Sequence, residues 1–197
     1  MAPDSNFSIT ITSGACIYWA ILLLVIPLPW AFAWLCAAAF HELSHCVALL
    51  LCRKRIEQIH INTHGAQIHT EYLCPATTIL CALAGPMGGL LLTGLGTHCP
   101  RLTICAMIQT AFNLLPVFPL DGGRALGGIL RLLLSESCVT AICKLIGITT
   151  VSIFVTLCLI AAFLLRCALL LLLPICVITA IYMERKFSCK WRSLKVQ

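Results

Sequence analysis

The fold is decided by the stretch Trp30-AFAWLCAAAFHELSHCVALLL-Cys52, an apolar run long enough to span a bilayer as a helix. It contains His41, Glu42 and His45 in one helical turn, although ionisable groups inside a bilayer are energetically costly. Residues four apart share a helix face, so the two histidines can offer their nitrogens to one metal ion, with Glu42 beside them. In a soluble helix this pattern is often a polar face, but none surrounds it here, which favours a metal site.

The composition indicates a membrane protein. Of the 197 residues, 60% are hydrophobic and only 10% are charged, and the mean hydropathy is +1.01. Soluble domains are about 45–50% apolar and about 25% charged, so a soluble globular enzyme and a disordered chain are excluded. The net charge of +6 reflects few acids rather than many bases, which excludes the usual nucleic-acid binder. The 14 cysteines form no Cys-x-x-Cys pair and most lie in apolar runs, so we expect reduced packing residues.

The apolar runs predict an all-α polytopic membrane protein with about six transmembrane helices. With both termini on the cytoplasmic side, all but Arg101 and Arg166 of the 13 lysines and arginines fall in cytoplasmic segments, in accord with the positive-inside rule. The first helix could instead begin nearer Ile9. The expected spans are Ala15–Leu28, Trp30–Cys52, Pro75–Leu95, Arg101–Leu120, Leu145–Leu165 and Cys167–Met183.

Between the second and third expected helices, the pattern changes to that of a short β-hairpin over Arg55–Glu71. Ile59 and Ile61 alternate with polar residues, and Gly65 lies near the middle. The exposed edge of such a hairpin could pair with an extended substrate strand. Three histidines in this segment raise the possibility of a second metal site, although solvated side chains are the favoured interpretation. They are His60, His64 and His69.

A catalytic zinc usually has three protein ligands and one open position, so the histidine pair needs a third ligand. Asp121 is the candidate, because it is the only acid between Glu71 and Glu136. It lies in the stretch Asn113-LLPVFPLDGG-Arg124, whose prolines and glycines are expected to break a helix. Irregular backbone at membrane depth is tolerated only inside protein or beside a cavity, which suits the wall of a site. A polar turn capped by Asp121 is the alternative. The helix-breaking residues are Pro116, Pro119, Gly122 and Gly123.

These segments together resemble the site-2 protease family of intramembrane zinc metalloproteases. The resemblance rests on HELSH in an apolar helix, Ala84-Gly85-Pro86 in the next, and the Asn113–Arg124 stretch in the one after. The order and spacing are similar to the compact bacterial branch typified by the stage IV sporulation protein FB, which processes a membrane-associated pro-sigma factor. The similarity covers roughly residues 30–124, about half of the chain.

The resemblance implies a role for each polar residue of these helices. His41, His45 and Asp121 would bind one zinc ion, and Glu42 would be the catalytic base. Asn113 would help to bind an unwound substrate segment or to stabilise the transition state. It also implies close packing around Gly85, which the small residue at i+4 supports independently.

We therefore expect residues 1–197 to form a single membrane-embedded metalloprotease domain, with a core at 30–124 and accessory helices at 15–28, 145–165 and 167–183. It would lie in a bacterial cytoplasmic membrane with both termini cytoplasmic. Its substrate would be a membrane-associated protein, such as a pro-sigma factor or a membrane-tethered regulator, cleaved near the cytoplasmic side by regulated intramembrane proteolysis. Gating would come either from a regulatory membrane partner or from the transmembrane part itself, and no nucleic-acid partner is expected.

Two other functions would also place histidine and aspartate inside a helix bundle. The first is a metal transporter, which would need polar residues reaching the outer side, where these helices are almost entirely apolar. The second is a zinc-binding membrane scaffold without protease activity, which would have no physical need for Glu42. Both alternatives are disfavoured by the sequence and are separable by experiment.

Overall fold

A computed structural model describes residues 8–11, 20, 23–24, 26–62, 65–70, 73–96, 98–164 and 166. Within these ranges, three helices are long and apolar enough to cross a membrane, which is typical of a membrane protein: Leu28–Leu51, Pro75–Thr93 and Glu136–Leu164. The predicted sixth span at 167–183 and most of the predicted first span at 15–28 lie outside the described residues. The total of six helices therefore stays a prediction.

Helices α2 (Leu28–Leu51) and α3 (Pro75–Thr93) correspond to the second and third expected spans within a few residues. Each has a proline in its first turn, where the missing N–H removes no helical hydrogen bond. Helix α2 ends where Arg53 adopts a positive φ of 54° and the Lys54 amide donates to the Leu49 carbonyl at 2.9 Å. The chain turns back there toward the sheet and α3.

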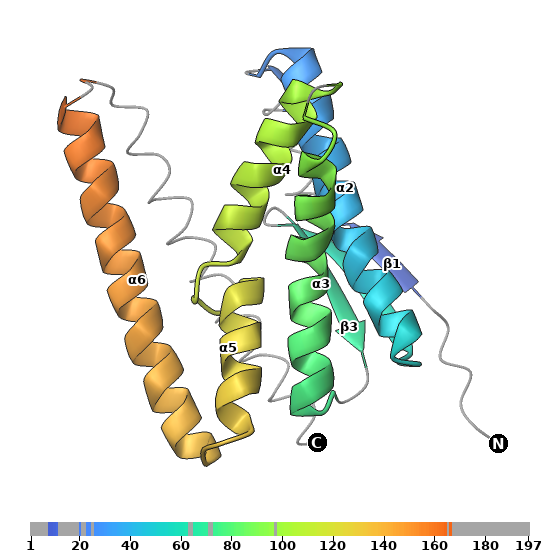
Figure 1. Cartoon of the computed structure of the whole chain (residues 1–197), viewed down its shortest axis with the longest axis vertical. Coiled ribbons are helices and arrows are strands. Elements are labelled where there is room, and N and C mark those ends of the chain that lie inside the picture. Colours follow the sequence, from blue (N-terminus) through green and yellow to red (C-terminus); the bar gives the residue numbers. More distant parts are fainter. Residues whose placement is uncertain are drawn as a thin grey trace.

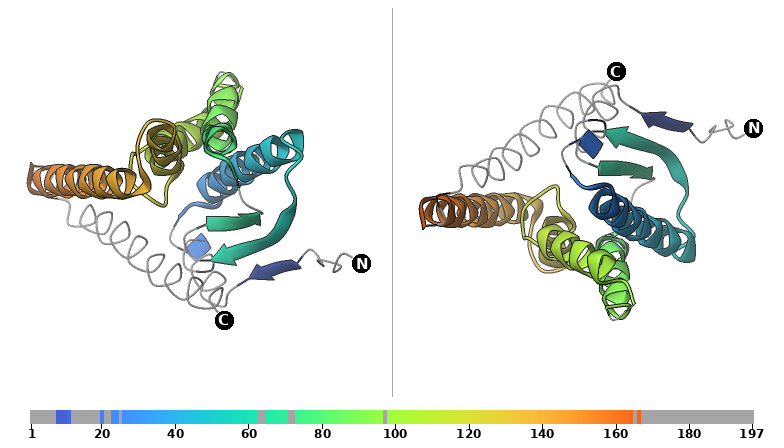
Figure 2. Two further views of the ribbon diagram at one scale, coloured as in Figure 1. Left: turned by 90° about the horizontal axis from the view of Figure 1, so that it is seen from below. Right: turned by 90° about the horizontal axis from the view of Figure 1, so that it is seen from above.

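A three-stranded sheet lies beside α2, which separates it from α3 and α4 (Figure 2). Strands β2 (Ile56–Asn62) and β3 (Gly65–Thr70) pair antiparallel in the interval where the sequence predicts a hairpin. Strand β1 (Ser8–Ile11) pairs parallel with β2, and its Ser-Ile-Thr-Ile pattern alternates as a strand requires. The suggestion that a first helix could begin near Ile9 is therefore wrong, and the fold is not purely helical.

The predicted fourth span at 101–120 is not one continuous helix, and it is interrupted within the stretch 113–124 where the sequence predicts a break. Helix α4 (Pro100–Asn113) ends at Asn113, and a separate helix α5 (Asp121–Arg131) follows a loop at 114–120. Pro116 and Pro119 lack the N–H groups that a continuing helix would need, and each also disfavours helical geometry in the residue before it. Figure 1 shows α5 below α4, with the loop displaced toward α6.

Helix α6 (Glu136–Leu164) begins nine residues before the expected start at Leu145. Glu136 in its first turn accepts a hydrogen bond from Arg131 at 2.9 Å, which joins the end of α5 to the start of α6. Val139 is buried there, whereas the helix beyond it stands apart from the other described helices (Figure 1). Helix α6 starts earlier than expected because a polar turn of helix precedes its apolar run.

Helices α2, α3 and α4 pack closely through small side chains. The buried cluster between them consists of Ala33, Ala37, Leu92, Cys105 and Ala106. Small residues allow membrane helices to approach closely and gain van der Waals contact. Buried Gln109 of α4 adds a hydrogen bond from its Nε2 to the Trp34 carbonyl of α2 at 2.9 Å. The bundle positions the polar residues considered next.

Candidate metal centre

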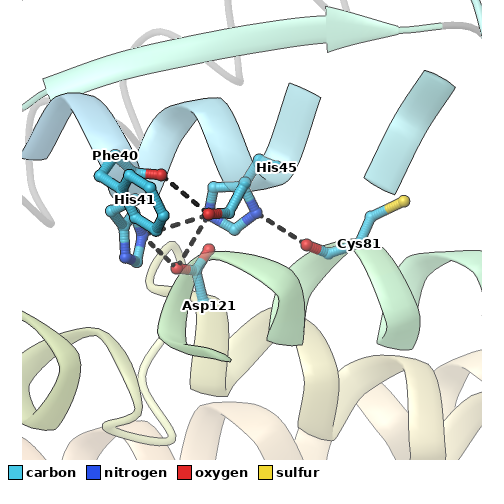
Figure 3. A network of polar contacts seen from close by, with 6 residues as sticks. Phe40, His41, His45, Cys81 and Asp121 are labelled. Carbon is cyan, nitrogen blue, oxygen red and sulfur yellow. Dashed lines mark hydrogen bonds and ion pairs between the residues drawn. The ribbon is translucent and has the colours of Figure 1, made fainter. Parts of the chain in front are cut away.

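Side chains from two helices that are distant in sequence, α2 and α5, meet in one cluster (Figure 3). Oδ2 of Asp121 lies 3.0 Å from Nε2 of His41 and 3.2 Å from Nε2 of His45, and the two nitrogens are 3.1 Å apart. His41 is 5% exposed and Asp121 is 7% exposed, so the cluster is enclosed by protein. Among the described residues, these three form the one group of metal-ligating side chains with such spacing.

The local structure explains why these residues meet. His41 and His45 are one helical turn apart on α2 and so face the same way. Asp121 is the first residue of α5, and it reaches the histidines because the chain breaks at 114–120 instead of continuing α4. The break at the predicted prolines is thus what brings the carboxylate to the centre, whereas the prediction that Gly122 and Gly123 also break the helix is wrong, because both lie in α5.

The orientation of His45 is set by the backbone of α3. Its Nδ1 donates a hydrogen bond to the Cys81 carbonyl at 2.7 Å. A carbonyl only accepts, so in the neutral imidazole the Nε2 atom carries a lone pair that faces Asp121. This pattern, with one ring nitrogen held and the other free, is typical of a metal-binding histidine. Nδ1 of His41, by contrast, is buried and has no hydrogen-bond partner among the described residues.

The donor set fits zinc. A carboxylate oxygen and the lone pair of His45 Nε2 converge with Nε2 of His41, and with neutral imidazoles at most one proton is available between these three atoms. A bound cation would satisfy all three at once. Two imidazole nitrogens with one carboxylate, leaving an open position, is a combination found in catalytic zinc sites.

Gly85 supplies a second indication that the cluster is built around a ligand. It is buried on α3, and the nearest atoms to a Cβ built there would be Nε2 of His45 and Nε2 of His41. A side chain at this position would occupy the space beside the nitrogens. The cluster is therefore closed on the α3 side by a residue without a side chain.

Glu42 lies next to the three converging residues. It is partly buried on α2, and its carboxyl group interacts electrostatically with His45, His41 and Asp121. It makes none of the hydrogen bonds that join those three residues. Its place beside the cluster, without belonging to it, is the arrangement that the HExxH pattern predicts for a base.

Asn113 is not part of the cluster in this structure. It is the partly buried last residue of α4, and among the described residues no hydrogen bond joins its side chain to His41, His45 or Asp121. Of the hairpin histidines, His64 and the side chains of His60 and His69 lie outside the described residues. A second metal site on the hairpin stays untested.

The four residues predicted to break the fourth span shape the backbone around Asp121. Pro116 and Pro119 lie in the loop. A Cβ on Gly122 would meet the Leu114 carbonyl, and a Cβ on Gly123 would meet the backbone of Val117. The glycines therefore let α5 begin in direct contact with the loop.

The Cys81 carbonyl is the functional group that sequence reasoning missed. A backbone carbonyl is present at every residue, so no residue type in the sequence marks the one that holds His45. The only available signal is indirect, since Cys81 is four residues before Gly85 and shares its helix face.

Comparison with known proteins identifies the fold. No family model and no curated protein matches the sequence. Among solved structures, the Site-2 Protease from Methanocaldococcus jannaschii matches with a TM-score of 0.64 and 18% sequence identity, over 89% of this chain and 90% of that chain. The chain therefore shares its fold with that site-2 protease along nearly its whole length.

Proposed function

We propose that this chain is an intramembrane zinc metalloprotease of the site-2 protease family that hydrolyses peptide bonds of membrane-associated proteins. The observation that carries the proposal is the convergence of His41, His45 and Asp121 from two helices, with Glu42 beside them. The fold shared with a site-2 protease supports the same conclusion independently of these residues.

In this proposal, His41, His45 and Asp121 hold one zinc ion. Bound zinc would supply Lewis acidity that polarises the scissile carbonyl and activates water. The enclosure of the three ligands, with His41 5% and Asp121 7% exposed, limits competing ligands and strengthens electrostatic interactions there. The Cys81 carbonyl keeps His45 in the orientation that leaves its Nε2 lone pair free.

Glu42 acts as the general base in this proposal. Its carboxylate takes a proton from the attacking water and delivers it to the leaving amine, as positioned carboxylates do in general acid–base catalysis. Asn113 lies at the end of α4, where the helical backbone stops, and would bind an extended stretch of substrate. A helical substrate has to unwind first, because its peptide bonds are shielded by neighbouring turns.

The position of the cluster along α2 supports cleavage near the cytoplasmic side. His45 is six residues before the end of α2 at Leu51, which is roughly 10 Å at 1.5 Å per residue. That end of the helix is followed by the basic stretch 53–55, which the positive-inside rule places in the cytoplasm. The substrate class that fits is a membrane-tethered regulator. The narrower resemblance to the sporulation branch stays a prediction from the sequence.

The test separates catalysis from metal binding. Purified chain in detergent is incubated with fluorescein-labelled casein as a general probe, in parallel with Glu42→Gln and with Glu136→Gln, an exposed carboxylate of α6. Glu42→Gln should retain zinc and lose roughly 10²–10⁴-fold in rate, whereas Glu136→Gln should cleave like the parent. Full activity of Glu42→Gln would refute the assignment of the base.

The same preparation distinguishes the alternatives. A zinc-binding scaffold would hold zinc and cleave nothing, and a metal transporter would move zinc into liposomes. The proposal predicts zinc-dependent cleavage by the parent and no zinc flux.

A further inference from the structure

Helix α3 presents three buried glycines to its neighbours: Gly85, Gly88 and Gly89. Each lies against a polar side chain, which for Gly88 is Ser44 of α2. Gly85 faces the imidazoles of His41 and His45, whereas Gly89, one turn further along the helix, faces the Thr110 hydroxyl of α4. Only the contact at Gly85 is made with atoms that would bind a metal.

The contact at Gly85 leaves no room for any side chain. A Cβ there would lie 2.6 Å from Nε2 of His41 and 2.6 Å from Cε1 of His45, and closer still to Nε2 of His45. Zinc–nitrogen bonds are about 2.0–2.1 Å long, so a methyl group would stand beside the nitrogens at nearly the distance of a bound ion. The atoms that it would crowd are the proposed ligand atoms themselves.

The imidazole rings cannot move away from a side chain at residue 85 without losing the contacts that orient them. His45 is held by its 2.7 Å hydrogen bond to the Cys81 carbonyl, which belongs to the same helix as Gly85. His41 is 5% exposed and lies 3.0 Å from Asp121, so a displaced ring would have to leave that carboxylate. A side chain at residue 85 would therefore separate the three ligand atoms from one another.

From these contacts we infer that Gly85 is a positioning residue of the metal centre, which reserves the volume beside His41 and His45 that the ion needs. Any side chain at this position strongly weakens metal binding and leaves the helices folded. This inference rests on the metal site of the proposed function, and it holds whether or not the chain cleaves peptides.

Two other glycines provide matched controls. Gly89→Ala puts a methyl group on the same face of α3, but against Oγ1 of Thr110, which is not a proposed ligand. Gly147→Ala on α6 meets nothing within 4 Å. All three substitutions raise helix propensity by roughly 1 kcal/mol, so a difference between them reports the local contact.

The experiment titrates the full chain in detergent with cobalt(II) after chelator treatment, followed by its visible absorption and by zinc competition. The parent, Gly147→Ala and Gly89→Ala should bind with affinities within a few-fold of one another, although Gly89→Ala should unfold at a lower temperature. Gly85→Ala should lose about 10–100-fold in affinity while its far-ultraviolet circular dichroism stays helical.

Three results would overturn the inference. The first is binding by Gly85→Ala within a few-fold of the parent, and the second is an equal loss in Gly89→Ala, which would assign the effect to general repacking of α3. The third is a parent that binds no metal, because the space beside Gly85 would then have no ion to accommodate. A parent that binds metal without cleaving peptides refutes the proposed function and leaves the inference standing.

A double-mutant cycle covers the case in which Gly85→Ala fails to fold. His41→Ala/His45→Ala removes the three atoms nearest to the new methyl group. In that background, Gly85→Ala should change the thermal midpoint little, whereas in the parent it should lower it strongly. An equal loss of stability in both backgrounds would contradict the proposed contact.

Discussion

The two halves of the α2–α3–α4 bundle are held together by different interactions. In the half that contains Trp30, small apolar residues such as Ala37 and Ala106 pack directly against one another. In the half that contains Cys52, α2 meets α5 through the polar cluster of His41, His45 and Asp121. The first half is thus held by apolar packing alone, whereas the second half brings together two imidazole nitrogens and a carboxylate oxygen that could hold a metal ion.

Chelation should give the largest difference between the two halves. Zinc bound at 100 times its dissociation constant stabilises the folded state by about 2.7 kcal/mol, so removing it should lower the thermal midpoint of the parent. The loss of stability should appear first as faster hydrogen exchange in α5, which Asp121 tethers to α2. It should be smallest at the α2–α4 contact around Ala37. Uniform loosening of both halves would contradict the comparison.

Overpacking the apolar half should lower stability by a smaller amount and, unlike a change in the polar half, should leave zinc affinity nearly unchanged. Ala37 is 1% exposed, and Ala37→Leu should destabilise the chain by roughly 1–3 kcal/mol through strain in a closely packed seam. Zinc affinity should remain within a few-fold of the parent, because Ala37 packs in the apolar cluster with Leu92, Cys105 and Ala106, one helical turn away from His41. Thermal unfolding and cobalt titration of the same sample measure both quantities, with exposed Phe163→Leu on α6 as the control. A large loss of zinc in Ala37→Leu would show that the halves are coupled.

Local sequence patterns predicted much of the polar half. The spacing of His41 and His45 placed them on one helix face, and Asp121 stood out as the only acid for many residues on either side. The apolar runs placed the starts of α2 and α3 at Trp30 and Pro75, within two residues of where the helices begin. These signals work because helix periodicity and the extent of an apolar run are properties of the local chain.

The remaining parts depend on contacts between distant segments. Strand β1 pairs with β2 across more than forty residues, and nothing local to Ser8–Ile11 specifies that partner. Helix α5 contains four glycines, which disfavour a helix, and it forms where they let its backbone approach the loop and α3. The role of the Cys81 carbonyl likewise follows only from the packing of α3 on α2.

The most direct test of the metal centre is the zinc content per chain of detergent-purified parent and Asp121→Ala, prepared identically without chelator. The exposed Glu136→Ala serves as the control for loss of a carboxylate. We predict about one zinc per chain in the parent and in the control, and a clear loss in Asp121→Ala. A parent without zinc, or full retention of zinc by Asp121→Ala, would contradict a three-ligand site that joins α2 to α5.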